Sequence, residues 1–141
     1  MYCAQADIEK LIPLKELARL TDDAAGTAVV AAVVDDAIAR AASLIDSYCA
    51  RLYQTPFADP CPAVICDMSA VLAAYELQAR RPQTMPEEWR KRKDDQLKTL
   101  LLIAKGEVVL PGAISAQGEP VSVPVASFVS SDRLFTRDTI Q

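Results

Sequence analysis

Cysteine is the residue type in this 141-residue chain best suited to hold a metal, because the sequence has four cysteines and no histidine. The four, Cys3, Cys49, Cys61 and Cys66, form no C-x-x-C pair, so a zinc site would need four thiolates at irregular spacings. Free, buried thiols in a reducing compartment fit this pattern better. We therefore expect no metal site and no cofactor.

The stretch TDDAAGT has a faint likeness to a calcium-binding loop. When Gly26 is set at the sixth loop position, Ala25 occupies a ligand position and Ala32 stands where a bidentate glutamate belongs. Neither alanine can coordinate a cation through its side chain. An ordinary turn between two helices is the better interpretation.

Catalytic groups are also missing from the sequence. There is no histidine to act as a general base, and the nucleophile, phosphate-loop, zinc-protease and dinucleotide motifs do not occur. Asp67 and Glu76 lie nine positions apart on one predicted helix. A rotation of about 100° per residue places their carboxylates on opposite sides of it. We expect that the chain is not an enzyme.

The strongest binding signal is the ending SSDRLFTRDTIQ, which combines two arginines with a leucine and a phenylalanine. Ordering about thirty residues of segment 107–141 costs roughly 30–60 kcal/mol of backbone entropy. Offsetting this at ~25 cal/mol/Å² needs roughly 1,200–2,400 Å² of apolar burial. The apolar residues of the segment cannot provide that area against one another, so we expect docking on the bundle or on a neighbouring chain. The expected partner-binding residues are Phe128, Arg133, Leu134, Phe135, Arg137, Asp138 and also Trp89.

Trp89 lies in the charged stretch EEWRKRKDD. Two roles remain open for it, an anchor of the core and an anchor of an interface. Acidic residues flank the RKRK run on both sides, and the net charge of −4 argues against a chain-wide nucleic-acid binder. Four opposite-charge pairs at a spacing of four residues predict a self-paired, solvated surface. The pairs are Glu87–Lys91, Glu88–Arg92, Arg90–Asp94 and Lys91–Asp95.

The elements that position these residues are predicted to be helical as far as residue 106. Asp7 is placed to cap a short helix, IEKLI, and Pro13 to begin a second, whose apolar stripe is Leu14, Leu17 and Leu20. Apolar residues at steps of three and four predict a helix over 29–53. Two more helices are predicted over 62–80 and 86–105, and Gly106 is placed to end the last.

The predicted fold is therefore all-α, a small bundle of four to five helices over residues 1–106. The helix over 62–80 carries few charges and should lie at the centre. Residues 107–141 are predicted to form an extended C-terminal arm outside the bundle. Valines at strand spacing in this arm, interrupted by Pro124, allow a short edge strand or hairpin.

Membrane and export signals are not apparent in the sequence. The first ten residues have no basic region followed by an apolar run, and no stretch of 18 uncharged apolar residues occurs. We expect no signal peptide, no membrane association and a cytosolic site of synthesis.

The order of several short blocks resembles the small head–tail connector proteins of tailed phages, specifically a Mu-like prophage family. The likeness begins with Tyr2 and ELARLTD, and continues through the helices that end at Arg80 and Gly106. An I-D-x-Y…Y-x-x-P pattern and an R-x-F-T-R-D ending complete it. These two blocks comprise Ile45, Asp46, Tyr48, Tyr53 and Pro56, and Arg133, Phe135, Thr136, Arg137 and Asp138. Two parts depart from the family, the loop AAGTAVV and residues 107–128.

The resemblance implies a structural virion protein located in the neck of the particle and present in the host cytoplasm during assembly. Such connectors are similar to adaptors that form a homo-oligomeric ring of about twelve copies. The implied partners are the portal protein and a downstream neck or tail protein, with DNA passing through the ring without sequence-specific binding. The alternative is a small helical regulatory or DNA-binding protein that uses the basic segment 80–93.

Overall fold

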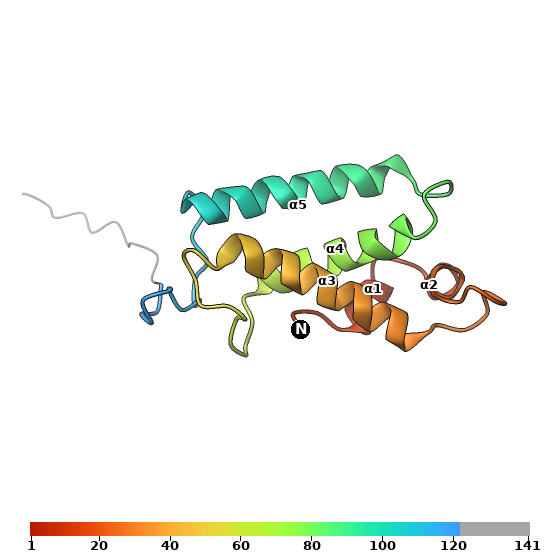
Figure 1. The fold of residues 1–141 in the computed structure, drawn as a ribbon, viewed down its shortest axis with the longest axis horizontal. Coiled ribbons are helices and arrows are strands. Elements are labelled where there is room, and N and C mark those ends of the chain that lie inside the picture. Colours follow the sequence, from red (N-terminus) through yellow and green to blue (C-terminus); the bar gives the residue numbers. More distant parts are fainter. Residues whose placement is uncertain (122–141) are drawn as a thin grey trace, which may run out of the picture.

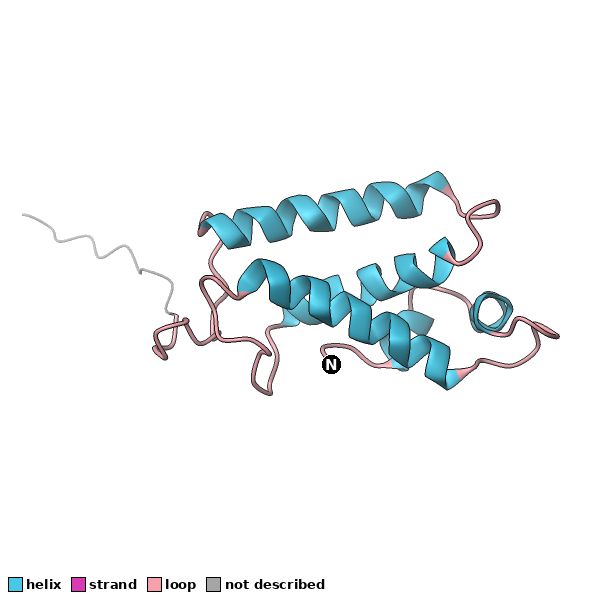
Figure 2. Ribbon diagram, in the orientation of Figure 1, coloured by secondary structure: helices cyan, strands magenta, loops and turns pink. Residues whose placement is uncertain are grey.

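The computed structural model describes residues 1–121, which form five helices and their connections (Figure 1). Two short helices, α1 (Gln5–Glu9) and α2 (Leu14–Thr21), precede the three long helices α3 (Ala31–Cys49), α4 (Ala63–Ala79) and α5 (Glu87–Lys105). Within this part of the chain, pairing between extended segments is limited to two isolated antiparallel bridges (Figure 2). The prediction of a small all-α bundle is confirmed.

Helix α4 lies at the centre of the bundle and packs against each of the other four helices. Helix α5 forms one outer layer, and α1 and α2 lie on the opposite side of α4 (Figure 1). A central place was expected for α4, because its sequence is apolar nearly all round and leaves no broad polar face for water. That expectation is confirmed.

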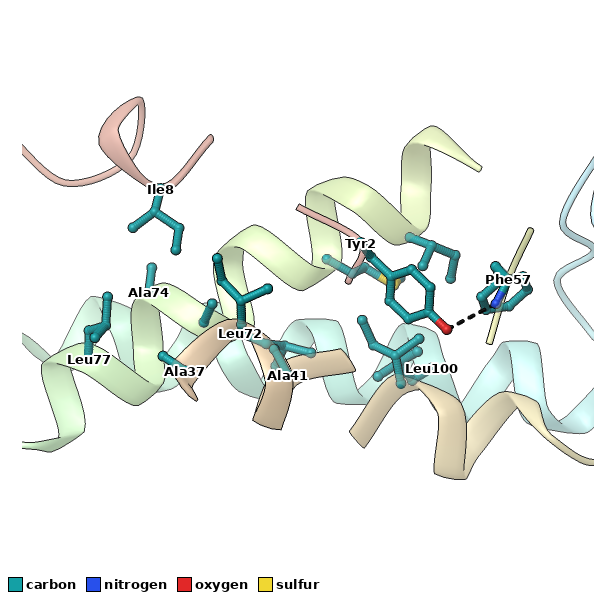
Figure 3. Close-up of a cluster of buried hydrophobic side chains, with 14 of the residues drawn as sticks. Tyr2, Ile8, Ala37, Ala41, Phe57, Leu72, Ala74, Leu77 and Leu100 are labelled. Carbon is teal, nitrogen blue, oxygen red and sulfur yellow. Dashed lines mark hydrogen bonds between the residues drawn. The ribbon is translucent and has the colours of Figure 1, made fainter. Parts of the chain in front are cut away.

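One hydrophobic core runs through the bundle and draws side chains from every helix. Figure 3 shows part of it, with Leu72 and Leu77 of α4 among side chains from the other elements. Helix α3 buries the face formed by Val34, Ala37, Ile38, Ala41, Ile45 and Cys49. The three-and-four spacing of these residues is the pattern that predicted the helix.

The ends of the long helices follow the proline and glycine positions. Pro62 and Pro86 each immediately precede the first helical residue, of α4 and α5 respectively. Gly106 follows α5 with a left-handed φ of 81°, and its N–H donates to the carbonyl of Ile103 at 3.0 Å. The predicted end of this helix at Gly106 is therefore confirmed, since a residue with a Cβ would be strained in this conformation.

Two predicted helix ends are wrong. Asp7 does not precede the first helix but lies inside α1, where its carboxylate accepts a hydrogen bond from the N–H of Ala4 at 3.0 Å. Helix α3 stops at Cys49 and not at Tyr53. Tyr53 instead forms an antiparallel bridge with Ser115, which draws the chain out of the helical path.

Residues 107–121 dock on the bundle, which is one of the two places expected for segment 107–141, and they do not extend away from it. They fold back on its end, where Leu110 and Ala113 become core residues with 1% and 3% of their surface exposed. A tight turn supports this segment, because the N–H of Ser115 donates to the carbonyl of Glu119 at 2.8 Å. Burial within the same chain therefore stabilises this part of the predicted arm.

Candidate interaction surfaces

The partner-binding residues predicted at the end of the chain lie outside the described residues. This applies to Phe128, Arg133, Leu134, Phe135, Arg137 and Asp138. Their proposed role in binding therefore remains a prediction. Trp89 is the one predicted partner-binding residue that lies among residues 1–121.

Trp89 is a core residue of the folded chain. Only 9% of its surface is exposed, and the guanidinium of Arg92 lies 5.0 Å from the ring centroid. A cation over the face of an indole ring is attracted by the negative potential of that face. Of the two interpretations of Trp89, the structure supports the core anchor, and little of the ring is left free for a partner.

Tyr2 joins three separate parts of the chain. Its hydroxyl donates to the carboxylate of Asp46 on α3 and accepts from the backbone N–H of Phe57 at 3.0 Å (Figure 3). The rings of Tyr2 and Phe57 meet edge to face, with centroids 5.6 Å apart. Burial, reinforced by the hydrogen bond to Asp46, raises the pKa of the Tyr2 hydroxyl above its ordinary value. Tyr2 and Asp46, both part of the family resemblance, thus hold the fold together.

Tyr53 has a similar role in the loop that follows α3, near the same C-terminal end of this helix. Its hydroxyl accepts a hydrogen bond from the N–H of Leu110 at 3.1 Å, and its ring packs beside Phe57. The contact fixes the start of segment 107–121 on the bundle. The sequence pattern singled out Tyr53 but gave no indication of this partner, because the two residues are 57 positions apart.

The basic segment 80–93 is largely engaged within the molecule. Arg80 donates to the carbonyls of Leu20 and Thr21 and pairs with Asp23 at 2.6 Å, while Arg81 pairs with Asp23 at 3.5 Å. Further contacts of basic side chains in the segment are Lys91–Glu87, Arg92–Glu88 and Lys93 over the ring of Tyr75. Three carboxylates, of Asp23, Glu87 and Glu88, therefore pair with basic side chains of the segment, which reduces the positive charge it offers to a nucleic-acid backbone.

Two of the four charge pairs predicted on α5 form, and two do not. Glu87–Lys91 and Glu88–Arg92 are ion pairs. Asp95 binds Lys98 at 3.0 Å and is not bonded to Lys91. A residue on a helix surface has neighbours both three and four positions away, so more than one pairing is open to each charge.

The loop that resembles a calcium site is ordered by its own aspartate. The carboxylate of Asp22 accepts hydrogen bonds from the N–H groups of Ala24 at 2.9 Å, Ala25 at 3.2 Å and Thr27 at 3.2 Å. These bonds lower the pKa of Asp22, because they favour its ionised form. The turn between the two helices was expected from the sequence, and the structure adds that the Asp22 side chain stabilises it.

The four cysteines are free thiols that form local contacts. Cys49 is fully buried, and the other three are partly buried. The thiol of Cys66 donates to the carbonyl of Cys61 at 3.8 Å, and burial together with the neighbouring Cys66 raises the pKa of Cys61 to about 12. Within residues 1–121 no group of three or more potential ligands could hold a metal ion. No helix in this same part of the chain is long and apolar enough to cross a membrane.

An apolar groove lies between α2 and the loop that follows it, with a volume of about 580 Å³. We call it the α2 groove, and its lining residues are Leu14, Lys15, Ala18, Thr27, Ala28 and Val29. The side chain of Leu14 is 59% exposed, and Val30, which follows the groove, is 39% exposed. The apolar stripe predicted from Leu14 to Leu20 is therefore buried at Leu17 and Leu20 and exposed at Leu14. Residues at steps of three drift by about 60° per step around a helix, which turns Leu14 away from Leu20.

A second apolar surface lies at the C-terminal end of α5 and on the segment after it. We call it the α5-end surface, and it consists of Leu101, Leu102, Val109 and Ile114, which are 37–44% exposed. Only Leu100 and Ile103 of the run LLLI are buried, because four successive helical residues point all around the axis.

These features define a small all-α protein whose described surface offers two apolar contact areas and a largely self-paired charged face. The family model for "Bacteriophage Mu, Gp36" matches residues 2–128, and the chain belongs to this family. It is a Mu-like phage protein, and the family indicates a structural or assembly protein of the phage. A comparison with curated proteins finds no match.

The matched range differs from the sequence resemblance in two places. Residues 107–128, which depart from the family pattern, fall within the matched range. The ending from Arg133 to Asp138, which contributed to the resemblance, falls outside it. Support for family membership therefore comes from the bundle and the segment that folds back on it.

Proposed function

We propose that this chain is a head–tail connector of a Mu-like phage. In this role, about twelve copies form a closed ring between the portal and the tail, and DNA passes through the ring without sequence-specific binding. The proposal places the protein in the neck of the virion, and in the host cytoplasm during assembly. The observation that carries it is the family match over residues 2–128, together with the connector resemblance of the blocks within that range.

The structure supports a role in assembly through its exposed apolar surfaces. Exposed apolar side chains that gather in two places are typical of proteins that bind other proteins. The α5-end surface consists of such residues, and the α2 groove has exposed Leu14 in its lining with Val30 next to it.

The test of this function is removal of the gene from an inducible prophage. We expect heads filled with DNA and complete tails that remain separate, because the joint between them is missing. Electron microscopy of the lysate gives the count of joined particles, and expression of the full chain from a plasmid should restore it. Normal virions from the deletion strain, or purified virions that lack the protein, would contradict the proposal.

The DNA-binding alternative makes a different prediction. A regulator that uses segment 80–93 should bind duplex DNA at ~50 mM salt and lose affinity steeply as salt rises. A connector should show almost no such binding, because Arg80, Arg81, Lys91, Arg92 and Lys93 already have partners. Fluorescence anisotropy with labelled duplex over a salt series separates the two functions.

The C-terminal residues have a separate place in the proposal. We expect Arg133 and Arg137 to pair with acidic groups of a partner, and Leu134 and Phe135 to fill an apolar pocket on the portal or on an adjacent copy. Deletion of residues 130–141 should abolish incorporation into particles. If the truncated chain joins heads to tails as well as the full chain does, this part of the proposal is wrong while the connector role stands.

A further inference from the structure

A closed ring requires two different surfaces on each copy, because every copy contacts one neighbour with one side and the other neighbour with the opposite side. The described chain has two candidates for these surfaces. Six of its eight exposed large hydrophobic side chains belong to the α2 groove region or the α5-end surface. The six are Leu14, Val30, Leu101, Leu102, Val109 and Ile114.

The two surfaces lie at opposite ends of the molecule. Helix α2 and the loop after it are at one end of the bundle, and the C-terminal end of α5 with residues 107–121 is at the other (Figure 1). One copy therefore cannot cover its own groove with its own α5-end surface. The α5-end surface of a second copy can cover this groove. The α2 groove of that second copy is then free to receive the α5-end surface of a third copy.

Charge complementarity supports this pairing of unlike ends. Lys15 lines the α2 groove and Arg19 lies one turn further along α2, both exposed and neither in an ion pair with a described residue. On the other side, residues 107–121 contain Glu107 and Glu119, and the end of α5 adds the exposed Lys105, so these three residues sum to one net negative charge. Opposite charges around an apolar contact favour the correct partner and fix its register.

The acidic groups close to α2 do not cancel its positive charge toward a partner. Glu16 accepts a hydrogen bond from Gln78 at 3.0 Å, and Asp23 is bound by Arg80 at 2.6 Å. The carboxylate of Asp22 accepts from the backbone of its own loop. Glu16 and Asp22 keep their negative charges, because their donors are neutral. The four basic residues on this side, Lys15, Arg19, Arg80 and Arg81, therefore exceed the three acidic ones by one charge.

From these observations we infer that the α2 groove binds the α5-end surface of a second copy of the chain. Leu101 and Leu102 enter the groove beside Leu14, and Glu107 approaches Lys15. The contact is head to tail, so it can repeat around a ring. The inference rests on the proposed function for its closure into a ring, but the contact itself can be tested with the purified protein.

The experiment is a disulfide trap in the full-length chain. Leu14→Cys and Leu101→Cys are made as separate variants, and both positions are exposed, so the fold should tolerate the change. Equal amounts are mixed and oxidised. We expect a covalent dimer that contains one copy of each variant, and no dimer above the wild-type background from either variant alone. A chain carrying both substitutions should form a ladder of oligomers.

Ser43→Cys is the matched control, since Ser43 is exposed on α3 and belongs to neither surface. Mixed with Leu101→Cys, it should give no more dimer than the wild type, whose native cysteines set the background. A charge exchange provides a second reading. Lys15→Glu is added to the Leu14→Cys chain, and Glu107→Lys to the Leu101→Cys chain. Either change alone should reduce the yield of the mixed dimer, and the two changes together should restore it.

The results separate the contact from the function. Trapping of Leu14→Cys with itself, equal trapping by Ser43→Cys, or no trapping at high protein concentration would overturn the head-to-tail contact. The connector role would be unaffected if the gene deletion still separates heads from tails. Conversely, the dimer of Leu14→Cys with Leu101→Cys could form while purified virions lack the protein. That result would support the contact and overturn the connector role.

Discussion

The hydroxyl of Tyr2 donates a hydrogen bond to the carboxylate of Asp46, which joins the N-terminal segment to α3 across 44 positions of sequence. The same oxygen accepts from the N–H of Phe57, so one side chain connects the start of the chain, α3 and the loop after α3. The bundle has few other polar links between these parts. The hydroxyl should therefore contribute measurably to stability.

Replacement of Tyr2 by phenylalanine keeps the ring and removes only the hydroxyl. We expect the free energy of unfolding to fall by ~1–3 kcal/mol, because the N–H of Phe57 loses its acceptor and Asp46 loses a donor. Urea denaturation followed by circular dichroism measures the change. Tyr48→Phe is the control, since the Tyr48 hydroxyl has no hydrogen-bond partner among the described residues, and its effect should stay within ~0.5 kcal/mol. Equal effects of the two variants would show that the hydrogen bonds of Tyr2 contribute nothing.

Arg80 holds the loop between α2 and α3 against the end of α4. Its guanidinium binds the carbonyls of Leu20 and Thr21 and the carboxylate of Asp23. Arg80→Ala should lower the free energy of unfolding by ~1–3 kcal/mol, since these acceptors lose a charged donor. Hydrogen exchange should accelerate in residues 22–30 first.

Arg81→Ala is the matched control for this prediction. Arg81 contacts the same loop at the longer distances of 3.4 and 3.5 Å, and its side chain is more exposed than that of Arg80. Pairs of this kind contribute about 0–1 kcal/mol. If both alanine variants exchange at the wild-type rate, the proposed role of Arg80 is wrong.

The sequence predicted the parts of this fold that depend on local pattern. The apolar surface of α4 required a central position, and Gly106 marked the end of α5, because periodicity and backbone preference act within a few residues. The contacts of Tyr2 and Tyr53 were not predictable in this way. Their partners lie 44 to 57 positions away and are chosen by the packing of whole helices.

The candidate surfaces were missed for a related reason. A hydrophobic run such as LLLI does not show which of its side chains are exposed, although a helix must turn some of them outward. Leu14 was assigned to an apolar stripe whose spacing of three drifts around the helix. The angle of each leucine around the helix axis follows from its position in the sequence, and this angle separates Leu14 from the buried Leu20.

Trp89 gives a direct optical report on the packing of α5, because it is the only tryptophan of the chain. Its emission should be blue-shifted in the native protein and move to longer wavelength on unfolding. Trp89→Ala should lower the free energy of unfolding by ~3–5 kcal/mol through the cavity it leaves. Arg92→Ala removes only the cation over the ring and should cost at most about 1 kcal/mol. A stable Trp89→Ala protein would show that the indole does not anchor the helix.

Cys49 should make the protein less stable at alkaline pH. Its side chain is fully buried in α3, and this burial, with a smaller effect of the nearby Asp46 carboxylate, raises the pKa of its thiol from 9.0 to about 11. In the unfolded chain the thiol ionises first, so between these values the unfolded state binds fewer protons than the native state. Stability is therefore complete below pH 9 and is lost as the pH rises toward 11, by about 1.4 kcal/mol for each pKa unit.

Cys49→Ala separates this titration from the packing of the side chain. At pH 7 the variant should be less stable than the wild type, because it leaves a small cavity in the core. Between pH 9 and 11 the difference between the two proteins should narrow, since only the wild type must keep this buried thiol protonated. Urea denaturation at closely spaced pH values, with a reducing agent present throughout, measures both curves. Parallel curves would mean that the Cys49 thiol ionises equally easily in the native and unfolded states, and would contradict the assignment of its raised pKa to burial.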